Sequence, residues 1–204
     1  MPFELPKPTV ELVKAECDAF DREEWLIEES LAQLREHFPK NTDIRHVLLK
    51  VLVLNKLYGT MIPDIKVETV AKHIVGLAND HSLDQLLPDG KIEAVAHIRD
   101  CPNLKQYAAF ASKFCSWHNP EAYPIYDGNV RACLWSYQNQ DPFAEIKKQD
   151  DLSYYQNLFD AVVAFRNHYE LNSLSFKQLD KFMYRVGGRI LRARSEQKPG
   201  ADAT

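Results

Sequence analysis

The sequence predicts an all-α protein, a compact bundle of eight to ten helices in two lobes around a cleft. Apolar residues recur at helical spacing almost everywhere, and no two alternating apolar and polar stretches are joined by a hairpin turn. The chain of 204 residues is 45% hydrophobic and 11% aromatic, with only 7 Gly. This composition is that of a globular domain with a real core, and it excludes mainly disordered and low-complexity proteins.

The first expected helix runs from Thr9 to His37 and ends at Pro39. The second, Ile44–Tyr58, is capped by Thr42 or Asp43. It is apolar on nearly all sides, which predicts a central buried helix. Further helices are expected at about Lys66–Ala78, Ser82–Leu87, Lys91–Arg99, Asn103–His118, Gly128–Tyr137, Asp150–Tyr169 and Ser175–Arg194. Residues 1–194 are therefore predicted to form a single all-α domain, with acidic helices over 9–38, followed by a disordered tail at 195–204.

No apolar run approaches the roughly 20 residues of a transmembrane helix, and the N-terminus carries no apolar signal segment. The cysteines Cys17, Cys101, Cys115 and Cys133 form no CxxC pair, and no histidine lies at zinc spacing from them. We therefore expect a reduced, cytoplasmic chain with no membrane contact, metal or cofactor. Core packing of Cys115 is favoured over a catalytic thiol near His118.

Charge is distributed unevenly along the chain, although the net charge of −4 gives no reason to expect nucleic-acid binding. Residues 1–40 hold 5 basic and 10 acidic side chains, and residues 176–198 hold 7 basic and 2 acidic ones. The acidic segment is a candidate interface for a protein partner. The basic segment carries cations at helical four-residue intervals, a candidate nucleic-acid-binding stripe of Lys177, Lys181, Arg185, Arg189 and Arg192. The alternative is a solvated face, which Asp180 and a helix break at Gly187-Gly188 favour.

The segment richest in candidate chemistry is Phe110–Arg131, F-A-S-K-F-C-S-W-H-N-P-E-A-Y-P-I-Y-D-G-N-V-R. Asp127 lies directly before a predicted helix, where an Asp is usually only the N-terminal cap. Two features favour a further role for it. Aromatic residues flank it, and a rigid Pro124 turn fixes its direction.

Three motifs resemble the helix-hairpin-helix DNA glycosylases, and more closely bacterial proteins with an 8-oxoguanine DNA glycosylase-like fold, some linked to antiphage defence. They are V-L-L-K-V-L-V-L-N-K-L-Y-G-T at 47–60, the F-A-S-K-F-C-S-W-H-N-P and P-I-Y-D-G-N-V segments at 110–130, and F-K-Q-L-D-K-F-M-Y-R-V-G at 176–187. The resemblance implies a glycosylase-like core over 43–190. In that superfamily the aspartate at the position of Asp127 caps a helix and faces a flipped nucleotide.

The resemblance implies that Asp127 stabilises positive charge on a sugar, or orients the attacking water, as an N-glycosidic bond breaks. The substrate would be an extruded base or a modified nucleotide, stacked on Trp117, Tyr123 or Tyr126. For any one of these three rings, core packing is the favoured alternative.

The chain departs from the glycosylase pattern in two places. The family's nucleophilic lysine lies at the start of the preceding helix, which here falls near Ala109 or Phe110. Lys113 lies about one helical turn from that position. Three interpretations of it are open: a substitute nucleophile, a phosphate contact or an exposed lysine. The family's Gly-rich hairpin is replaced by R-D-C-P-N-L-K-Q-Y at 99–107, which has no Gly. Base release without strand cutting is therefore expected.

Three polar residues complete the candidate substrate-binding set. Asn55 lies in the most apolar helix, where it either pins a helix pair or faces the pocket. His118 and Asn119 end a helix, and they either satisfy its last carbonyls or line the pocket. The leading hypothesis is an N-glycosidase-like hydrolase. The alternatives are an inactive glycosylase-fold module that binds nucleotide, nucleic acid or protein, and a purely structural helical partner protein.

Overall fold

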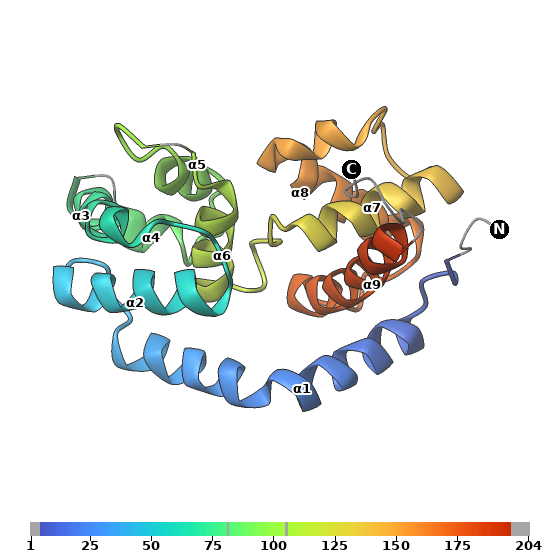
Figure 1. Ribbon diagram of the computed structural model, residues 1–204, viewed down its shortest axis with the longest axis horizontal. Coiled ribbons are helices and arrows are strands. Elements are labelled where there is room, and N and C mark those ends of the chain that lie inside the picture. The colour runs from blue at the N-terminus through green and yellow to red at the C-terminus, as the bar shows by residue number, and fades with distance from the viewer. Residues whose placement is uncertain (1–4, 81, 105, 197–204) are drawn as a thin grey trace, which may run out of the picture. The chain divides into compact units, whose positions relative to one another are not determined.

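The computed structural model describes residues 5–80, 82–104 and 106–196 of the chain (Figure 1). The described residues are 71% helical and contain no strand, so the all-α prediction is confirmed. The described helices are α1 (Val10–His37), α2 (Ile44–Leu57), α3 (Asp64–Asp80), α4 (Leu83–Leu86), α5 (Glu93–Arg99), α6 (Ala108–His118), α7 (Gly128–Gln140), the 3-10 helix η1 (Gln149–Ser153), α8 (Tyr155–His168) and α9 (Phe176–Glu196).

The chain divides into two compact units. Unit 1 comprises residues 1–23 and 126–204, and unit 2 comprises residues 24–125. The first half of α1 belongs to unit 1 and its second half to unit 2. Whether residues 1–194 behave as one domain stays a prediction.

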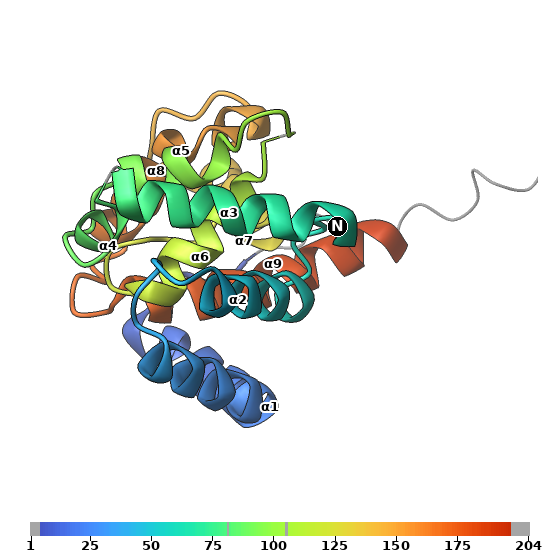
Figure 2. The ribbon, with the colours of Figure 1, turned by 90° about the vertical axis from the view of Figure 1, so that its left-hand side faces the viewer.

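Unit 2 is built on two helix pairs, α2 with α3 and α5 with α6 (Figure 2). Asp43 is the cap of α2, because its side chain accepts a hydrogen bond from the backbone N–H of Arg45 at 2.9 Å. Helix α2 packs on α3 and α6. Val70 and Ile74 of α3 and Phe114 of α6 are buried core residues of this unit.

The prediction that α2 is buried on all sides is wrong. Its buried residues are Val47, Lys50, Val51 and Leu54, which share one face. Leu49, Leu52 and Leu57 on the other sides are 45%, 43% and 42% exposed. A helix with apolar residues all round is therefore not always central, because exposed leucines are tolerated at a protein surface.

Unit 1 has an aromatic core between α7, α8 and α9. The ring of Phe165 lies 5.4 Å from that of Tyr137 and 4.7 Å from that of Tyr169, centroid to centroid. Tyr137 is fully buried, and its hydroxyl donates to the backbone oxygen of Pro6. The segment before α1 is thus fastened to α7 within this unit.

Helix α9 runs without interruption from Phe176 to Glu196, so the predicted break at Gly187-Gly188 is wrong. Gly187 is instead a packing position: a Cβ placed there would lie 1.9 Å from the backbone oxygen of Asn129 in α7. Ser195 and Glu196 of the predicted tail belong to α9, and residues 197–204 lie outside the described part of the chain. No described helix combines the length and apolarity that crossing a membrane requires.

Candidate functional site

Asp127 is the N-terminal cap of α7. Its backbone is extended, with φ −145° and ψ 153°, and its Oδ1 accepts a hydrogen bond from the backbone N–H of Asn129 at 2.8 Å. The side chain is half-buried. The capping role predicted from the sequence is confirmed.

Two neighbours in unit 1 hold this turn in place. The backbone of Asn129 packs directly on Gly187 of α9. Arg131, one helical turn beyond Asp127, lies over the ring of Tyr126 at 5.6 Å and donates to Ser153 Oγ at 2.9 Å. The aromatic residue before the carboxylate is therefore tied through Arg131 to η1.

Lys113 lies in the middle of α6 and is buried, not exposed. Its Nζ donates to the backbone oxygen of Tyr58, the C-terminal cap of α2, at 3.0 Å and lies 5.7 Å from the centre of the Tyr58 ring. A cation at this end of a helix satisfies a carbonyl and interacts favourably with the helix dipole. Lys113 belongs to unit 2 and Asp127 to unit 1.

Two of the predicted stacking rings are core residues of unit 2. Trp117 is buried and its Nε1 donates to the backbone oxygen of Leu31 at 2.9 Å. Tyr123 is 1% exposed, and its single hydroxyl proton is shared between the backbone oxygens of Leu86 at 2.9 Å and Lys91 at 3.0 Å. Tyr126 is half-buried, so it is the most accessible of the three.

Asn55 performs neither of its two predicted roles. Its Oδ1 accepts from Thr60 Oγ1 at 2.8 Å and from the backbone N–H of Ile62 at 2.9 Å, and its Nδ2 donates to the Ile62 oxygen at 2.8 Å. The amide thereby closes the loop after α2 and fixes Met61 between two bonded neighbours, at a positive φ of 62°.

A pocket of about 320 Å³ opens in unit 2, lined by Pro39, Asp84, Leu87, Pro88, His118 and Asn119. The Asn119 amide donates to the backbone oxygens of Leu87 and Pro88 and not to those of its own helix. Burial, with the nearby cations Lys50 and Arg35, holds the pKa of His118 well below its usual range. His118 is therefore neutral at pH 7, and its buried Nε2 has no partner among the described residues.

Asp84 of this pocket is the end of a chain of polar contacts that was not predicted from the sequence. Lys50 is fully buried, and its Nζ donates to the Lys40 oxygen at 2.9 Å and to Asn41 Oδ1 at 2.8 Å. Asn41 donates in turn to Asp84 from its backbone N–H and from Nδ2, the latter at 2.6 Å. Burial lowers the pKa of Lys50 to about 8. The burial of Lys50 could have been predicted, because Lys50 falls on the same helix face as the apolar residues Val47, Val51 and Leu54.

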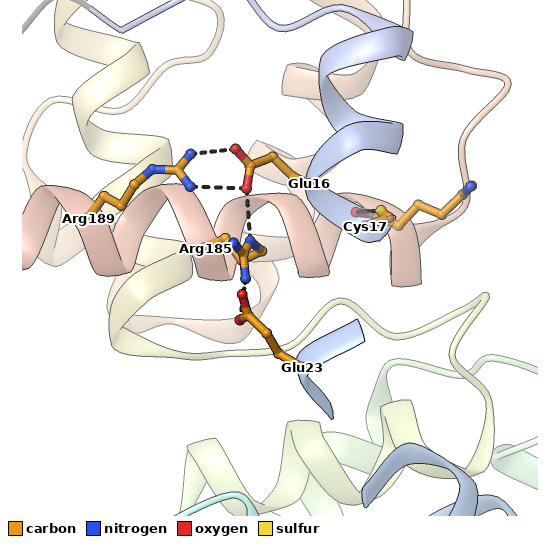
Figure 3. A network of polar contacts seen from close by, with 6 residues as sticks. Glu16, Cys17, Glu23, Arg185 and Arg189 are labelled. Carbon is orange, nitrogen blue, oxygen red and sulfur yellow. Dashed lines mark hydrogen bonds and ion pairs between the residues drawn. The ribbon is translucent and has the colours of Figure 1, made fainter. Parts of the chain in front are cut away.

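The predicted nucleic-acid-binding stripe on α9 meets the acidic half of α1 within unit 1. Arg189 binds both carboxylate oxygens of Glu16, at 2.7 and 3.0 Å, and Arg185 bridges Glu16 at 2.9 Å and Glu23 at 2.5 Å (Figure 3). These bonds lower the pKa of Glu16 and raise that of Arg185. Three cations of the stripe are thus engaged inside the protein, since Lys181 also pairs with Asp21.

Lys177 is half-buried and Arg192 is exposed. They complete the predicted stripe. Carboxylates of α1 therefore neutralise three of the five cations that this stripe could offer to a nucleic acid.

The four cysteines are buried free thiols. Complete burial raises the pKa of Cys115 well above its usual range, so it is a protonated core residue and not a thiolate nucleophile. Within the described ranges, no three His, Cys, Asp or Glu side chains gather as metal ligands.

Comparisons with known proteins place the chain in a family. The model of the HI_0787_N family, described as an N-terminal domain, matches residues 12–122 and thus nearly all of unit 2. An uncharacterized protein of Haemophilus influenzae is 32% identical over 180 residues, which cover 86% of this chain and 83% of the relative. No solved structure matches significantly. The chain therefore belongs to the HI_0787_N family.

Proposed function

We propose that this member of the HI_0787_N family is an N-glycosidase-like hydrolase that releases a modified or flipped base from nucleic acid or from a nucleotide. One observation carries the proposal: the half-buried carboxylate of Asp127 caps α7 directly after an aromatic, proline-containing turn. The order along the chain also fits the glycosylase resemblance, since the packed pair α5 and α6 precedes the capping aspartate.

In this mechanism the carboxylate of Asp127 acts on the sugar and not on the base. Cleavage of the glycosidic bond builds positive charge on the sugar ring, and a fixed negative charge nearby lowers the energy of that state. The hydrogen bond from the Asn129 N–H and the contact between α7 and Gly187 hold the carboxylate in one orientation. Preorganisation of this kind avoids the cost of turning dipoles during the reaction.

The position of Lys113 supports release without strand cutting. A lysine nucleophile forms a Schiff base through a neutral, accessible amine. The Lys113 amine is buried in the middle of α6 and donates to the Tyr58 oxygen. We therefore assign water as the attacking group and Lys113 to the stability of unit 2.

The test is a base-release assay on a panel of modified DNA and RNA oligonucleotides and nucleotides, with freed bases detected by mass spectrometry. We expect release by the native chain and a loss of about 10²-fold or more in Asp127→Asn, as for removal of other charge-stabilising groups. Asn caps a helix nearly as well as Asp, so the variant keeps its fold.

Asp43→Asn is the matched control, because Asp43 caps α2 through the same type of hydrogen bond, to the backbone N–H two residues ahead. It should release bases at the native rate. No release from any substrate, or equal release by native chain and Asp127→Asn, would overturn the proposal.

The 320 Å³ pocket of unit 2 favours a second candidate, a module that binds a nucleotide or another small molecule without cleaving it. All six lining residues lie inside the segment 12–122 that matches the family. Binding of the same panel should then survive Asp127→Asn and weaken in Asp84→Asn, in a titration followed by calorimetry.

A further inference from the structure

The second half of α1, in unit 2, presents an exposed face that is both apolar and acidic. Trp25 and Leu26 on this face are 63% and 60% exposed. Glu29 follows at i,i+4 from Trp25, and Glu36 two turns later, so both carboxylates share the same side of the helix. We call Trp25, Leu26, Glu29 and Glu36 the acidic face.

The outer side of α2, in the same unit, carries exposed apolar and basic residues. Leu49 and Leu52 are 45% and 43% exposed. Arg45 lies one turn before Leu49, and Lys56 lies one turn after Leu52, on the same side. Arg45 pairs with Asp43 but stays 83% exposed, which leaves its guanidinium open to a second carboxylate. We call Arg45, Leu49, Leu52 and Lys56 the basic face.

The two faces match in length as well as in charge. Each spans eleven residue steps, or about 17 Å at the rise of an α-helix. Both are exposed at the same time in one chain, so neither covers the other within that chain. We propose that the acidic face of α1 in one copy docks on the basic face of α2 in a second copy.

Apolar contact between Trp25, Leu26 and the two leucines would supply most of the affinity. The charges would set the choice of partner, because two acidic or two basic faces repel each other. Helix faces of this size bury less than the roughly 800 Å² per partner of a standard interface. We therefore expect reversible association at micromolar concentrations. The inference is independent of the proposed base release.

The first experiment is sedimentation equilibrium of the full chain from about 1 to 200 μM. The mean mass should rise above the 23.5 kDa of one copy as the concentration increases. Trp25→Glu and Leu49→Glu should each weaken association at least tenfold. Ile65→Glu is the matched control: Ile65 is an apolar residue of α3, 83% exposed, outside both faces, and its variant should associate like the native chain.

A charge exchange gives the sharper test. Glu29→Lys with Glu36→Lys makes both faces of a copy basic, and Arg45→Glu with Lys56→Glu makes both faces acidic. Each double variant alone should be monomeric, and an equimolar mixture should associate again. A native chain that stays monomeric over the whole range, association that Leu49→Glu leaves unchanged, or a mixture that stays monomeric would each overturn the proposal.

Discussion

The two units of this protein accommodate their cations in opposite ways. Unit 2 buries Lys50 and Lys113 and surrounds their ammonium groups with amide and carbonyl oxygens. Unit 1 keeps Arg185 and Arg189 closer to solvent and pairs both with the carboxylate of Glu16. Lone lysines in apolar stretches are thus structural here, and a regular row of cations is neutralised by an acidic helix of the same unit.

The largest effect should come from Lys50→Ala. The substitution leaves Asn41 Oδ1 and the Lys40 oxygen without their donor and opens a cavity, for a loss of about 3–5 kcal/mol in unfolding free energy. Urea denaturation followed by circular dichroism measures it. Lys56→Ala, on the exposed side of the same helix, should stay within about 0.5 kcal/mol of the native chain. Similar losses in both variants would contradict the buried role of Lys50.

The same lysine should make stability depend on pH in the alkaline range. Its pKa falls from 10.5 in the unfolded chain to about 8 in the folded one. Between these values the unfolded state binds more protons, so the free energy of unfolding rises with pH. The rise amounts to about 3 kcal/mol at 1.36 kcal/mol per pKa unit. It is measured as the stability of the native chain minus that of Lys50→Met from pH 7 to 11. A flat difference would show that Lys50 is not destabilised by burial.

In unit 1, close packing should matter more than any one ion pair. Gly187→Ala places a methyl group 1.9 Å from the Asn129 oxygen and should cost about 2–3 kcal/mol. Gly188→Ala is the matched control, because a Cβ added at Gly188 would lie 3.4 Å from Asn129 Nδ2 and would not overlap the backbone of α7. Alanine favours a helix interior over glycine, so this variant should keep or raise the melting temperature. Equal destabilisation by both would mean that α9 does not approach α7 as closely as described.

The smallest effect belongs to the ion pairs of unit 1. The Glu16 carboxylate accepts three hydrogen bonds from Arg185 and Arg189. Glu16→Gln removes its charge and one of its two acceptor oxygens, and should cost about 1–2 kcal/mol. Glu23→Gln should cost less than about 0.5 kcal/mol, because the Glu23 side chain is 60% exposed. Because the pKa of Glu16 is lowered on folding, its contribution is present above pH 4.5 and is lost as the pH falls through the folded value. The unfolding free energies of both variants, measured from neutral to acid pH, check this order. A larger loss for Glu23→Gln than for Glu16→Gln would contradict it.

Much of the local structure was predictable from the chain alone. The first helix was expected at Thr9–His37 and found at Val10–His37, and Asp127 caps α7 as expected. Helix starts, caps and proline stops depend on residues a few positions apart, so a single sequence carries them. The start of α6 was missed by five residues, at Ala108 in place of Asn103, because an apolar stretch does not mark its own N-terminus without a capping residue.

The candidate site residues were predictable only in part. Asp127 in unit 1, and His118 and Asn119 at the pocket of unit 2, were singled out from their positions at helix ends. Asn41 and Asp84 were not identified. They lie 43 residues apart, and only the hydrogen bond between their side chains shows that they belong to one polar chain. Asn55 was recognised as unusual, but its partners belong to a loop whose path depends on where α3 packs.

By itself the sequence determined that this protein is helical, where most of its helices lie and which residues share a face. Those properties follow from the period of the helix, which acts over one or two turns. Only the tertiary structure decided what each face meets. It paired Glu16 with Arg189, 173 residues away, turned an apparently all-apolar α2 outward on one side, and buried Lys50 on the other. Helical periodicity fixes the direction of a side chain relative to its own helix, whereas the partner depends on packing between distant segments.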